Sequence, residues 1–417
     1  MNKSIQHLFT SCYQKMVEAT LPSETIKEAI KNIPKNHNGK TIVIGAGKAS
    51  SQMAKAFEDN WIGDIEGFVT TRYGYKTACN KIQIYESSHP VPDINGLNAA
   101  KKTLDLLECL TKDDLVIALI SGGGSALLCL PEQFLSFEEK QNIHQQLLAS
   151  GANISEMNTI RKHLSKIKGG KLANVAHPAK VYSLIISDVP GDNPAMVSSG
   201  LTVSDNTTPK DALDLIEKYH LSVSDAIKEN LNNIHPIENK HNTTHNIISS
   251  ASIGLKAVEK YLQSLDYTVN YLGDDLEGES SELAVKHAQL ARNLKNKKSL
   301  NEKIAILSGG ETTVTLPKDP GRGGRNTEYV LAIMNELNGE EGIYAAAFDT
   351  DGIDGTEDNA GAFYHPGLSI KAKVNNIEPQ IYLDNHDSYS FFENLGSLYI
   401  PGPSGTNVND LRIIIIH

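Results

Sequence analysis

Short apolar runs that end in glycine-rich loops recur along this chain, and they constrain its fold more than any other feature. Residues 41–44 run into the sequence GAGKAS, and residues 115–120 run into SGGGSA. Stretches with helical spacing lie between the runs, at residues 49–57 and 95–110. Strands that alternate with helices form βαβ units around a parallel sheet. The first half is therefore predicted to be a Rossmann-like α/β domain, a parallel sheet with helices on both faces.

The second half repeats this alternation after a polar stretch. Residues 206–245 contain no glycine loop, whereas residues 303–307 run into SGGET and residues 342–348 into DTDGIDG. A chain of 417 residues suits two domains of ordinary size. We therefore predict an N-terminal α/β domain at residues 1–240 and a C-terminal mixed α/β domain at residues 241–417.

Charge and composition exclude several classes of protein. The net charge is −11, whereas a face that binds nucleic acid must be basic to replace counterions. The sequence has no apolar run of about 18 residues, so no membrane span is expected. The 4 cysteines lie far apart without a C-x-x-C motif, which is typical of reduced thiols. We expect a cytoplasmic protein without nucleic-acid or membrane partners.

The GAGKAS loop (residues 45–50) places a lysine where a strand meets a helix. Backbone N–H groups at a helix start favour an anion, and Lys48 is expected to point at whatever the loop holds. The loop is not a Walker A sequence, because the first glycine and the final hydroxyl of that motif are missing. It matches the dinucleotide fingerprint at Gly45 and Gly47, but Ser50 stands in place of the third glycine. No carboxylate ends the next strand, so NAD is disfavoured, whereas Arg72 would suit NADP.

The SGGGSA loop (residues 121–126) has three interpretations. A nucleophile elbow requires G-x-S-x-G, and this pattern is incomplete around both Ser121 and Ser125. The amides of Gly122, Gly123 and Gly124 could instead form a nest that binds phosphate. A tight strand-to-helix turn is the structural alternative. The residues favour the nest, and the turn stays open.

Polar loops elsewhere in the first half offer further contacts for a ligand. Ser88 and His89 lie in a rigid proline-rich loop, where the histidine is either a ligand contact or a satisfied loop residue. Asn158 and Arg161 belong to the most basic stretch of an acidic chain, which suits an anion site or a solvated helix face. Asp188 follows a predicted strand, where it could hold Mg²⁺, act as a base or simply shape a turn.

The second half adds charged residues within loops of small residues. Glu311 follows Gly309 and Gly310, and Asp351 lies in a carboxylate-rich loop after a predicted strand. Arg325 follows two glycines, and an arginine in such a loop contributes little to packing unless its guanidinium binds an anion. Lysine and arginine that spread charge, together with carboxylates that bind Mg²⁺, are the groups needed for phosphoryl transfer.

In their order along the chain, these motifs resemble those of the class II glycerate kinases (glycerate 2-kinases), whose C-terminal part is called the MOFRL domain. The matching stretches run from residue 41 to residue 410. They are GAGKAS, SSHPVPD, SGGGSALL, NTIRKHLSKIKGGKLA, ISDVPGD, SGGETTV, GRGGRNTE, FDTDGIDGTEDNAGAF and GPSGTNVNDL. The chain departs from the family pattern at Ile353, Pro401 and Ser404, where threonine is usual. These departures bear on substrate preference rather than on the reaction class.

The resemblance implies a two-domain α/β protein with its active site in the interdomain cleft. It implies phosphorylation of D-glycerate on its 2-hydroxyl with ATP and Mg²⁺, which gives 2-phospho-D-glycerate and ADP. The functional lysine and arginine of the family correspond to Lys48 and Arg325. Asp188 and Glu311 complete the expected catalytic set, Asp188 and Asp351 are the expected metal ligands, and a homodimer is an assembly that the chain could form. The residues expected to bind substrate or nucleotide are Gly45, Gly47, Ser88, His89, Ser121, Gly122, Gly123, Gly124, Ser125, Asn158, Arg161, Gly309, Gly310, Asn326, Asp351, Gly405, Thr406 and Asn407.

Two other functions remain as alternatives. An NADP-dependent hydroxypyruvate reductase would use the GAGKAS loop together with Arg72. A non-catalytic sugar-phosphate sensor would bind its ligand without turnover. The sensor leaves the carboxylate-rich loops of the second half unexplained.

Overall fold

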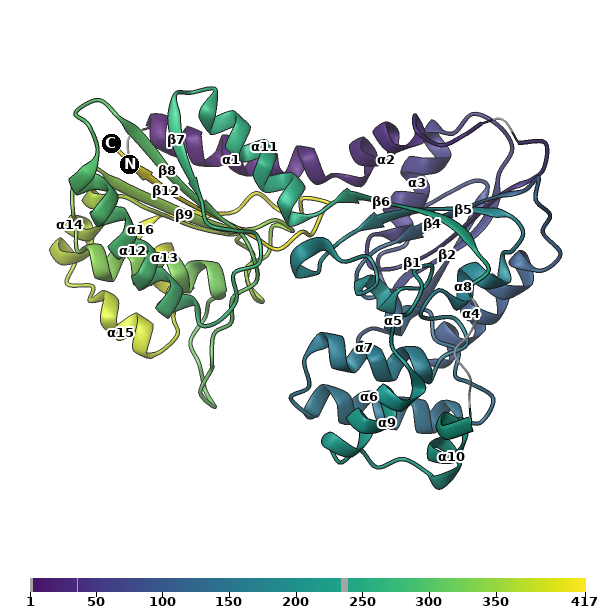
Figure 1. The fold of residues 1–417 in the computed structure, drawn as a ribbon. Helices are drawn as coiled ribbons and strands as arrows, with labels where there is room; N and C mark the ends of the chain where they lie inside the picture. The colour runs from purple at the N-terminus through teal and green to yellow at the C-terminus, as the bar shows by residue number, and fades with distance from the viewer. Residues whose placement is uncertain (1–2, 36, 234–238) are drawn as a thin grey trace. The chain divides into compact units, whose positions relative to one another are not determined.

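The computed structural model describes residues 3–35, 37–233 and 239–417. Its contacts divide the chain into two compact units (Figure 1). The N-terminal unit is Pro22–Ile248, and the C-terminal unit joins Met1–Leu21 to Ser249–His417. Within the described ranges, no helix combines the length and apolar character that a membrane span requires.

The N-terminal unit contains the predicted Rossmann-like sheet. Its strand order is β3-β2-β1-β4-β5-β6, which is the order of dinucleotide-binding folds. The pairs β3–β2, β2–β1, β1–β4 and β4–β5 are parallel. Strands β1 and β4 are buried along their whole length, as their apolar sequences require in a sheet covered on both faces. The strands are β1 (Thr41–Ala46), β2 (Glu66–Arg72), β3 (Ile82–Ser87), β4 (Leu115–Ile120), β5 (Lys180–Ile186) and β6 (Asn242–Ser249).

Helices cover both faces of this sheet (Figure 1). Helix α3 lies on one face, whereas α4 and α8 lie on the other, where they share an apolar core with Ile42, Ile44 and Val116. Helices α6, α7, α9 and α10 form a separate lobe with its own apolar core. The helices are α2 (Pro22–Ile30), α3 (Ser50–Asn60), α4 (Ile94–Leu107), α5 (Gly124–Leu127), α6 (Phe137–Ala149), α7 (Ile154–His163), α8 (Lys171–Val175), α9 (Pro209–Lys218) and α10 (Asp225–Asn233), with short 3₁₀ turns η1 (Pro190–Asp192) and η2 (Val197–Ser199).

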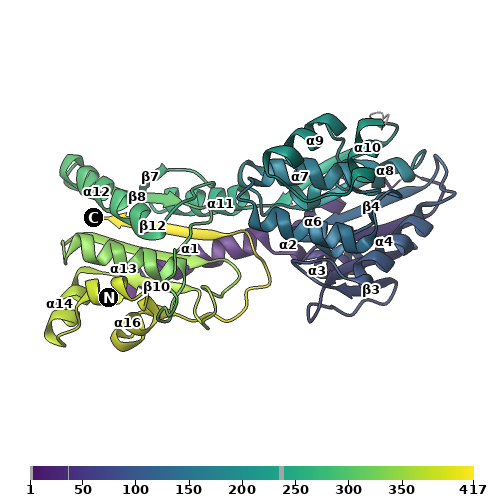
Figure 2. The ribbon, with the colours of Figure 1, turned by 90° about the horizontal axis from the view of Figure 1, so that it is seen from below.

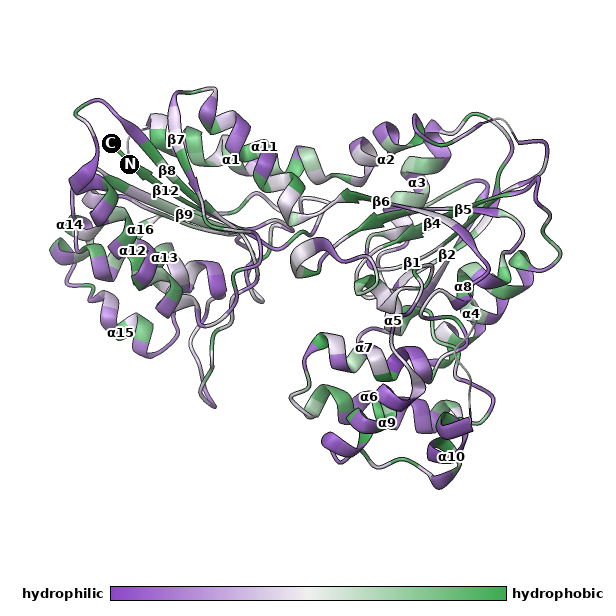
Figure 3. Ribbon diagram, in the orientation of Figure 1, coloured by the Kyte–Doolittle hydropathy of each residue, from purple (hydrophilic) through white to green (hydrophobic). Residues whose placement is uncertain are grey.

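The C-terminal unit has the predicted mixed α/β fold. Its strand order is β11-β10-β9-β12-β8-β7, in which β7 and β8 pair in parallel and the other pairs are antiparallel. The central strand β12 is wholly buried and is apolar apart from Asp410 and Arg412 (Figure 3). The strands are β7 (Tyr267–Tyr271), β8 (Lys303–Ser308), β9 (Ile343–Asp349), β10 (Gly361–Tyr364), β11 (Leu398–Tyr399) and β12 (Asp410–Ile416).

Helices also cover both faces of the second sheet. Seen from below, α12, α13, α14 and α16 lie in front of the strands and α1 lies behind them (Figure 2). Helices α12, α13, α14 and α16 share one apolar core with β8, β9, β10 and β12. The helices of this unit are α1 (Lys3–Thr20), α11 (Ala251–Gln263), α12 (Ser280–Lys297), α13 (Arg325–Leu337), α14 (Pro366–Val374), α15 (Pro379–Asp384) and α16 (Ser388–Leu395).

Helix α1 belongs to the C-terminal unit, although it comes first in the sequence. Its Tyr13 ring meets Phe348 edge to face with ring centroids 5.6 Å apart, and Phe9 packs on Phe363 at 6.2 Å. The division differs from the expected boundary after residue 240, because the first unit starts at Pro22 and ends at Ile248 within β6. The apolar face of α1 looks the same in sequence whichever sheet it covers.

The stability of the C-terminal unit is expected to depend on pH through His287 on α12. This side chain is buried, its Nδ1 lies 2.7 Å from the Tyr329 hydroxyl, and burial, aided by Arg412, lowers its pKa to about 4. As pH falls below 6.5, the unfolded chain binds a proton that the folded chain does not, so the free energy of unfolding decreases until about pH 4. Relative to a His287→Gln variant, the wild type should lose about 2 kcal/mol between pH 7 and pH 5 in urea denaturation. Equal losses in both proteins would contradict the shifted pKa.

Candidate active site

Backbone amides join the two glycine loops of the N-terminal unit. The amide of Gly47 donates to a carbonyl oxygen of β2 at 3.1 Å, and that of Lys48 donates to Gly122 at 2.8 Å. The amide of Ala49 donates to the side-chain oxygen of Ser121 at 3.0 Å. The amides that lead into α3 are therefore engaged within the protein. They are not free to hold the pyrophosphate that such a loop binds in dinucleotide folds.

The glycines of the GAGKAS loop allow this close approach. Gly45 is buried in β1, and a side chain there would overlap the carbonyl oxygen of Leu119 on β4. Gly47 has a φ of +150°, and a side chain there would overlap Ser121. The structure therefore explains both glycines by backbone packing, whereas their contact with a ligand stays a prediction.

The SGGGSA loop presents amides that the protein itself does not use. In the part of the chain that the structure describes, the N–H groups of Gly122–Gly124 have no hydrogen-bond acceptor. Gly123 lies in the left-handed region with a φ of +82°, as in backbone nests that bind anions. The Ser125 hydroxyl lies 2.9 Å from that of Ser199, and the Ser121 hydroxyl accepts a backbone amide. The hydroxyls therefore support the loop, and its amides form a nest.

Lys48, His89 and Asp188 surround this nest, which we define as residues 122–124. A Cβ atom placed on Gly123 would lie 3.2 Å from Cε of Lys48 and 3.0 Å from Cδ2 of His89. A Cβ atom on Gly122 would overlap the carboxylate of Asp188. Over the described residues, the Lys48 ammonium has no hydrogen-bond or ion-pair partner. The structure thus brings together three side chains that the sequence placed in separate motifs.

Burial sets the charges around the nest. Together with smaller contributions from Lys48 and Arg72, it lowers the pKa of His89 to about 4, so the imidazole is neutral at pH 7. Burial also raises the pKa of Asp188, and the nearby Lys48 opposes this effect. Ser88 is half-buried and directly precedes His89 at the end of β3. Among the described residues, an ammonium without a partner thus lies beside a neutral imidazole and a half-buried carboxylate.

Two serines that sequence reasoning missed support the SGGGSA loop. Ser198 donates to the carbonyl oxygen of Ser121 at 2.6 Å, and Ser199 donates to the side-chain oxygen of Asn158 at 2.7 Å. Both have positive φ, 51° and 57°, which is uncommon outside glycine. Asn158 therefore reaches the loop through Ser199 and Ser125. The local signal for this support is the pair of hydroxyls before a glycine in the sequence VSSG.

Arg161 lies in a buried basic cluster beside the loop. Its Nη2 is 3.9 Å from the sulfur of Met157, and its Nε is among the buried nitrogens without a partner in the described chain. Burial lowers its pKa to about 10. Its neighbours are two buried lysines, Lys140 and Lys168, and His144, which burial keeps neutral, so two like charges lie close to it.

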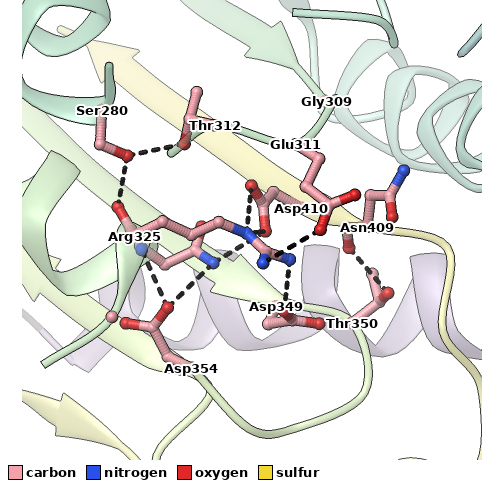
Figure 4. Close-up of polar contacts among 12 residues, drawn as sticks. Ser280, Gly309, Glu311, Thr312, Arg325, Asp349, Thr350, Asp354, Asn409 and Asp410 are labelled. Carbon is pink, nitrogen blue, oxygen red and sulfur yellow. Dashed lines mark hydrogen bonds and ion pairs between the residues drawn. The ribbon is translucent and has the colours of Figure 1, made fainter. Parts of the chain in front are cut away.

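In the C-terminal unit, Arg325 is surrounded by carboxylates (Figure 4). It is the first residue of α13. Its Nε donates to Asp410 at 2.9 Å, its Nη2 donates to Asp349 at 2.6 Å, and its Nη1 lies 3.4 Å from Glu311. Asp349 and Asp410 are buried, whereas Glu311 is exposed. Nη1 has the longest and most exposed contact, so it is the donor most accessible to an incoming anion.

The register of the second sheet explains why two buried aspartates meet at Arg325. Asp410 on β12 pairs directly with Asp349 on β9. Like charges in opposed positions destabilise a sheet, and the Arg325 guanidinium offsets their repulsion. Burial and Asp410 raise the pKa of Asp349, and Arg325 opposes this shift. Sequence reasoning missed both aspartates, whose signal is a carboxylate at the end of an apolar run.

Arg412 links these aspartates to the SGGET loop. It is fully buried, and it donates to the Asp410 carboxylate at 2.5 Å and to the carbonyl oxygen of Gly309 at 2.7 Å. Gly310 has a φ of +101°, and its carbonyl oxygen accepts the amide of Asp410 at 3.2 Å. Gly309 and Gly310 therefore hold the loop that carries Glu311. Sequence reasoning also missed Arg412, which looks like an interruption of an apolar strand.

Asn326 and Asp354 hold the start of α13. The carboxylate of Asp354 is fully buried and accepts the amides of Asn326 at 2.9 Å and Thr327 at 2.8 Å. The side chain of Asn326 donates to Asp410 at 2.8 Å. A carboxylate that accepts the first amides of a helix stabilises its start. Arg325 therefore projects from a firmly held position.

The loop at residues 402–407 was predicted to bind a ligand, and some of its residues contact the carboxylate-rich loop after β9, whereas others do not. Asn407 donates to the half-buried Asp351 at 3.2 Å. Thr406 instead donates to the carbonyl oxygen of Thr20 on α1 at 3.1 Å. Gly405, which directly precedes Thr406 and Asn407, turns the chain with a φ of +86°. The structure joins Asp351 to Asn407 and places Thr406 against α1.

Two protein families match the sequence, one in each half. A domain of unknown function, DUF4147, matches residues 8–232, and the MOFRL family matches residues 304–410. The D-glycerate 2-kinase of Thermotoga maritima is 36% identical over 419 residues, which cover 99% of each chain. The chain belongs to the class II glycerate kinase family.

A further relative and a solved structure also match this member of the glycerate kinase family along nearly its whole length. An Agrobacterium vitis protein with the provisional name hydroxypyruvate reductase is 44% identical over 409 residues, which cover 97% of this chain and 93% of that protein. The crystal structure of the glycerate kinase from Thermotoga maritima matches with a TM-score of 0.92 and 36% identity over 100% of both chains. The resemblance drawn from the motifs is confirmed.

The family resemblance implies Mg²⁺, and some carboxylates of this glycerate kinase family member could bind this ion. No group of three or more His, Cys, Asp or Glu side chains within the described ranges is placed to hold a metal ion. Mg²⁺ is usually held by one or two carboxylates together with waters and substrate phosphates. Asp188 beside the nest and Asp351 each offer one carboxylate of this kind. Asp349 and Asp410 suit the ion less well, because guanidinium groups occupy them.

Proposed function

We propose that the protein transfers the terminal phosphoryl group of ATP to the 2-hydroxyl of D-glycerate, which gives 2-phospho-D-glycerate and ADP. Family membership supports this, since relatives that align along nearly the whole chain are named glycerate 2-kinases. The observation that carries the proposal is the Lys48 ammonium, which, over the part of the chain that the structure describes, has no partner and lies beside three unengaged amides. Such a site binds an anionic group, and both substrates carry one.

The two clusters of charged residues serve the same reaction in this proposal. In the N-terminal unit, Lys48, His89 and the nest amides hold an anionic group of a substrate, and Arg161 adds positive charge. In the C-terminal unit, Arg325 stabilises the charge of the transferring phosphoryl group. Glu311 orients the Nη1 donor of Arg325 through their contact. Phosphoryl transfer depends mainly on positioning and charge, so a general base has a minor part.

Asp188 and Asp351 are the proposed ligands of Mg²⁺. The ion would neutralise charge on the phosphates of ATP when it is bound. Asp188 suits this role because its half-buried carboxylate lies against Gly122 of the nest, and a bound cation would favour the charged form that burial disfavours.

Purified protein is expected to release ADP from ATP with D-glycerate, and its product should feed enolase directly. Enolase acts on 2-phosphoglycerate, so a signal without added mutase identifies the 2-hydroxyl as the acceptor. EDTA should abolish ADP release, and excess Mg²⁺ should restore it. A coupled signal that appears only after a mutase is added would contradict phosphorylation at the 2-hydroxyl. Binding without turnover would indicate a sensor instead.

An NADP-dependent hydroxypyruvate reductase is the second candidate, favoured by the provisional name of the Agrobacterium vitis relative and by the strand order. Two contacts weigh against it. The amides that lead into α3 are engaged, and the Arg72 guanidinium lies over the Tyr75 ring at 3.6 Å. Consumption of NADPH with hydroxypyruvate, in the absence of ATP, would support this candidate over the kinase. The cytoplasmic location and the homodimer stay predictions.

A further inference from the structure

Two lysines of the N-terminal unit are fully buried, and both donate to backbone carbonyl oxygens. The ammonium of Lys168 lies 2.8 Å from the carbonyl oxygen of Ser125 and 3.1 Å from that of Leu128. The ammonium of Lys140 lies 3.2 Å from the carbonyl oxygen of Leu164. Within the described part of the chain, neither lysine forms an ion pair with a carboxylate. Carbonyl oxygens alone therefore solvate two buried positive charges.

Such charges are costly to bury without a counter-charge. A buried ammonium loses its hydration, and carbonyl oxygens replace only part of it. Arg161 adds a third cation to the same region, where it disfavours the charged form of both lysines, and Lys140 disfavours the charged form of Lys168. An anionic group bound nearby would offset this repulsion. The buried cluster therefore points to negative charge that a ligand supplies.

Lys168 stands directly behind the loop where we place such a ligand. Its partner Ser125 follows the nest residues 122–124, whose amides are unengaged. The same ammonium also binds Leu128, so it ties together both ends of the short helix α5. Lys48 and His89 both lie beside Gly123 of the nest. Two cations therefore lie close to this loop, Lys48 beside Gly123 and the buried Lys168 at the carbonyl oxygens of Ser125 and Leu128.

We propose that Lys168 is a positioning residue of the glycine loop, which fixes the loop backbone and strengthens its affinity for an anionic substrate group. This inference rests on the proposed function, because it concerns the same anion site. The bound group is a phosphate of the nucleotide or the carboxylate of the acid. Lys168 acts through the backbone of Ser125 and through its charge, and it does not touch the substrate.

The proposal implies that anion affinity changes near neutral pH. Burial lowers the pKa of Lys168 to about 7, and Lys140 and Arg161 contribute to the shift, whereas Cys129 opposes it. His144 on α6 also faces Lys168, and burial keeps it neutral with a pKa of about 3. An anion favours the charged form of the lysine. Affinity should therefore fall as pH rises through 7, where Lys168 loses its proton.

The test is the affinity of wild type and of Lys168→Met for ADP and for D-glycerate, each measured separately by titration calorimetry at about pH 6 and pH 8. One of the two ligands is expected to bind about tenfold more weakly to Lys168→Met at the lower pH, with a flattened pH dependence. The ligand that loses affinity is the one held by the nest. Lys140→Met removes an equally buried ammonium of the same cluster that contacts α7 rather than the loop, so a smaller loss of affinity than in Lys168→Met is expected, and an equal loss would contradict a role through the loop backbone. Wild-type affinity and pH dependence in Lys168→Met for both ligands would overturn the proposal.

A second variant keeps the test decisive if Lys168→Met does not fold. Lys168→Arg retains a positive charge that does not titrate near neutral pH. It should keep at pH 8 the affinity that wild type shows at pH 6, and an unchanged pH dependence would overturn the proposal. Binding is measured without turnover, so the two hypotheses can fail separately. If the wild type binds ADP but forms no ADP from ATP and D-glycerate, the proposed function is contradicted, whereas the role of Lys168 in anion binding is not.

Discussion

Replacement of Lys48 by methionine is expected to lower kcat/KM for D-glycerate by about a hundredfold or more. Methionine keeps most of the side chain's length, so it removes the ammonium while leaving the nest amides in place. The ammonium lies beside those amides without a partner in the described chain, so its loss removes charge that an anionic ligand would meet. Steady-state ADP release, with each substrate varied in turn, measures the effect. A loss confined to KM indicates ground-state binding, whereas a loss in kcat indicates a contact made in the transition state.

Lys55→Met provides the control for Lys48. Lys55 lies on α3, which follows the loop that carries Lys48, and there it is half-buried and pairs with Asp59 one turn away. Surface pairs of this kind contribute little, so kcat/KM should be unchanged. If the two variants retained similar and nearly full activity, Lys48 would have no part in the reaction.

Replacement of Arg325 by methionine is expected to reduce both activity and stability. Removal of the guanidinium should lower kcat/KM by about a hundredfold or more. It also leaves Asp349 and Asp410 opposed in the sheet, which should cost about 3 kcal/mol of unfolding free energy. The pKa of Asp349, already raised, should rise further, so the folded chain holds a proton that the unfolded chain releases at lower pH. Below the raised wild-type pKa of Asp349, pH changes the stability of both proteins alike. The deficit of the variant should therefore grow as pH rises through that pKa, which urea denaturation across pH can measure.

Arg322→Met is the matched control for Arg325, because it changes an arginine of the same glycine-rich loop. Arg322 is exposed, pairs with Glu357 at 2.7 Å and lies 4.0 Å from the centre of the Tyr389 ring. Its loss should change stability by less than about 1 kcal/mol and leave kcat/KM near the wild-type value. An Arg325→Met protein with wild-type activity would remove Arg325 from the reaction, even if its stability fell as expected.

Much of the candidate site follows from local sequence, because a cation within a glycine loop has few structural uses. Lys48 and Arg325 were predicted on that basis, and the structure places both among charged groups. The GAGKAS amides differ from expectation, since Ser121 and Gly122 of a distant loop accept two of them. Whether an amide is free depends on the neighbour that folding brings to it, and local sequence does not contain that neighbour.

The sequence by itself determined most of the strands, the glycine loops after them, the two kinds of sheet and the family, but not β10. These features depend on apolar periodicity and on backbone conformations that glycine permits, which are properties of neighbouring residues. Only the tertiary structure decided that α1 covers the second sheet, that Asp410 faces Asp349 across Arg325, and that Lys168 stands behind the nest. Those relations join residues far apart in the chain, and they are set by sheet register and by the face on which each helix packs. Local patterns specify which residues are buried, whereas the assembled fold specifies what each buried residue meets.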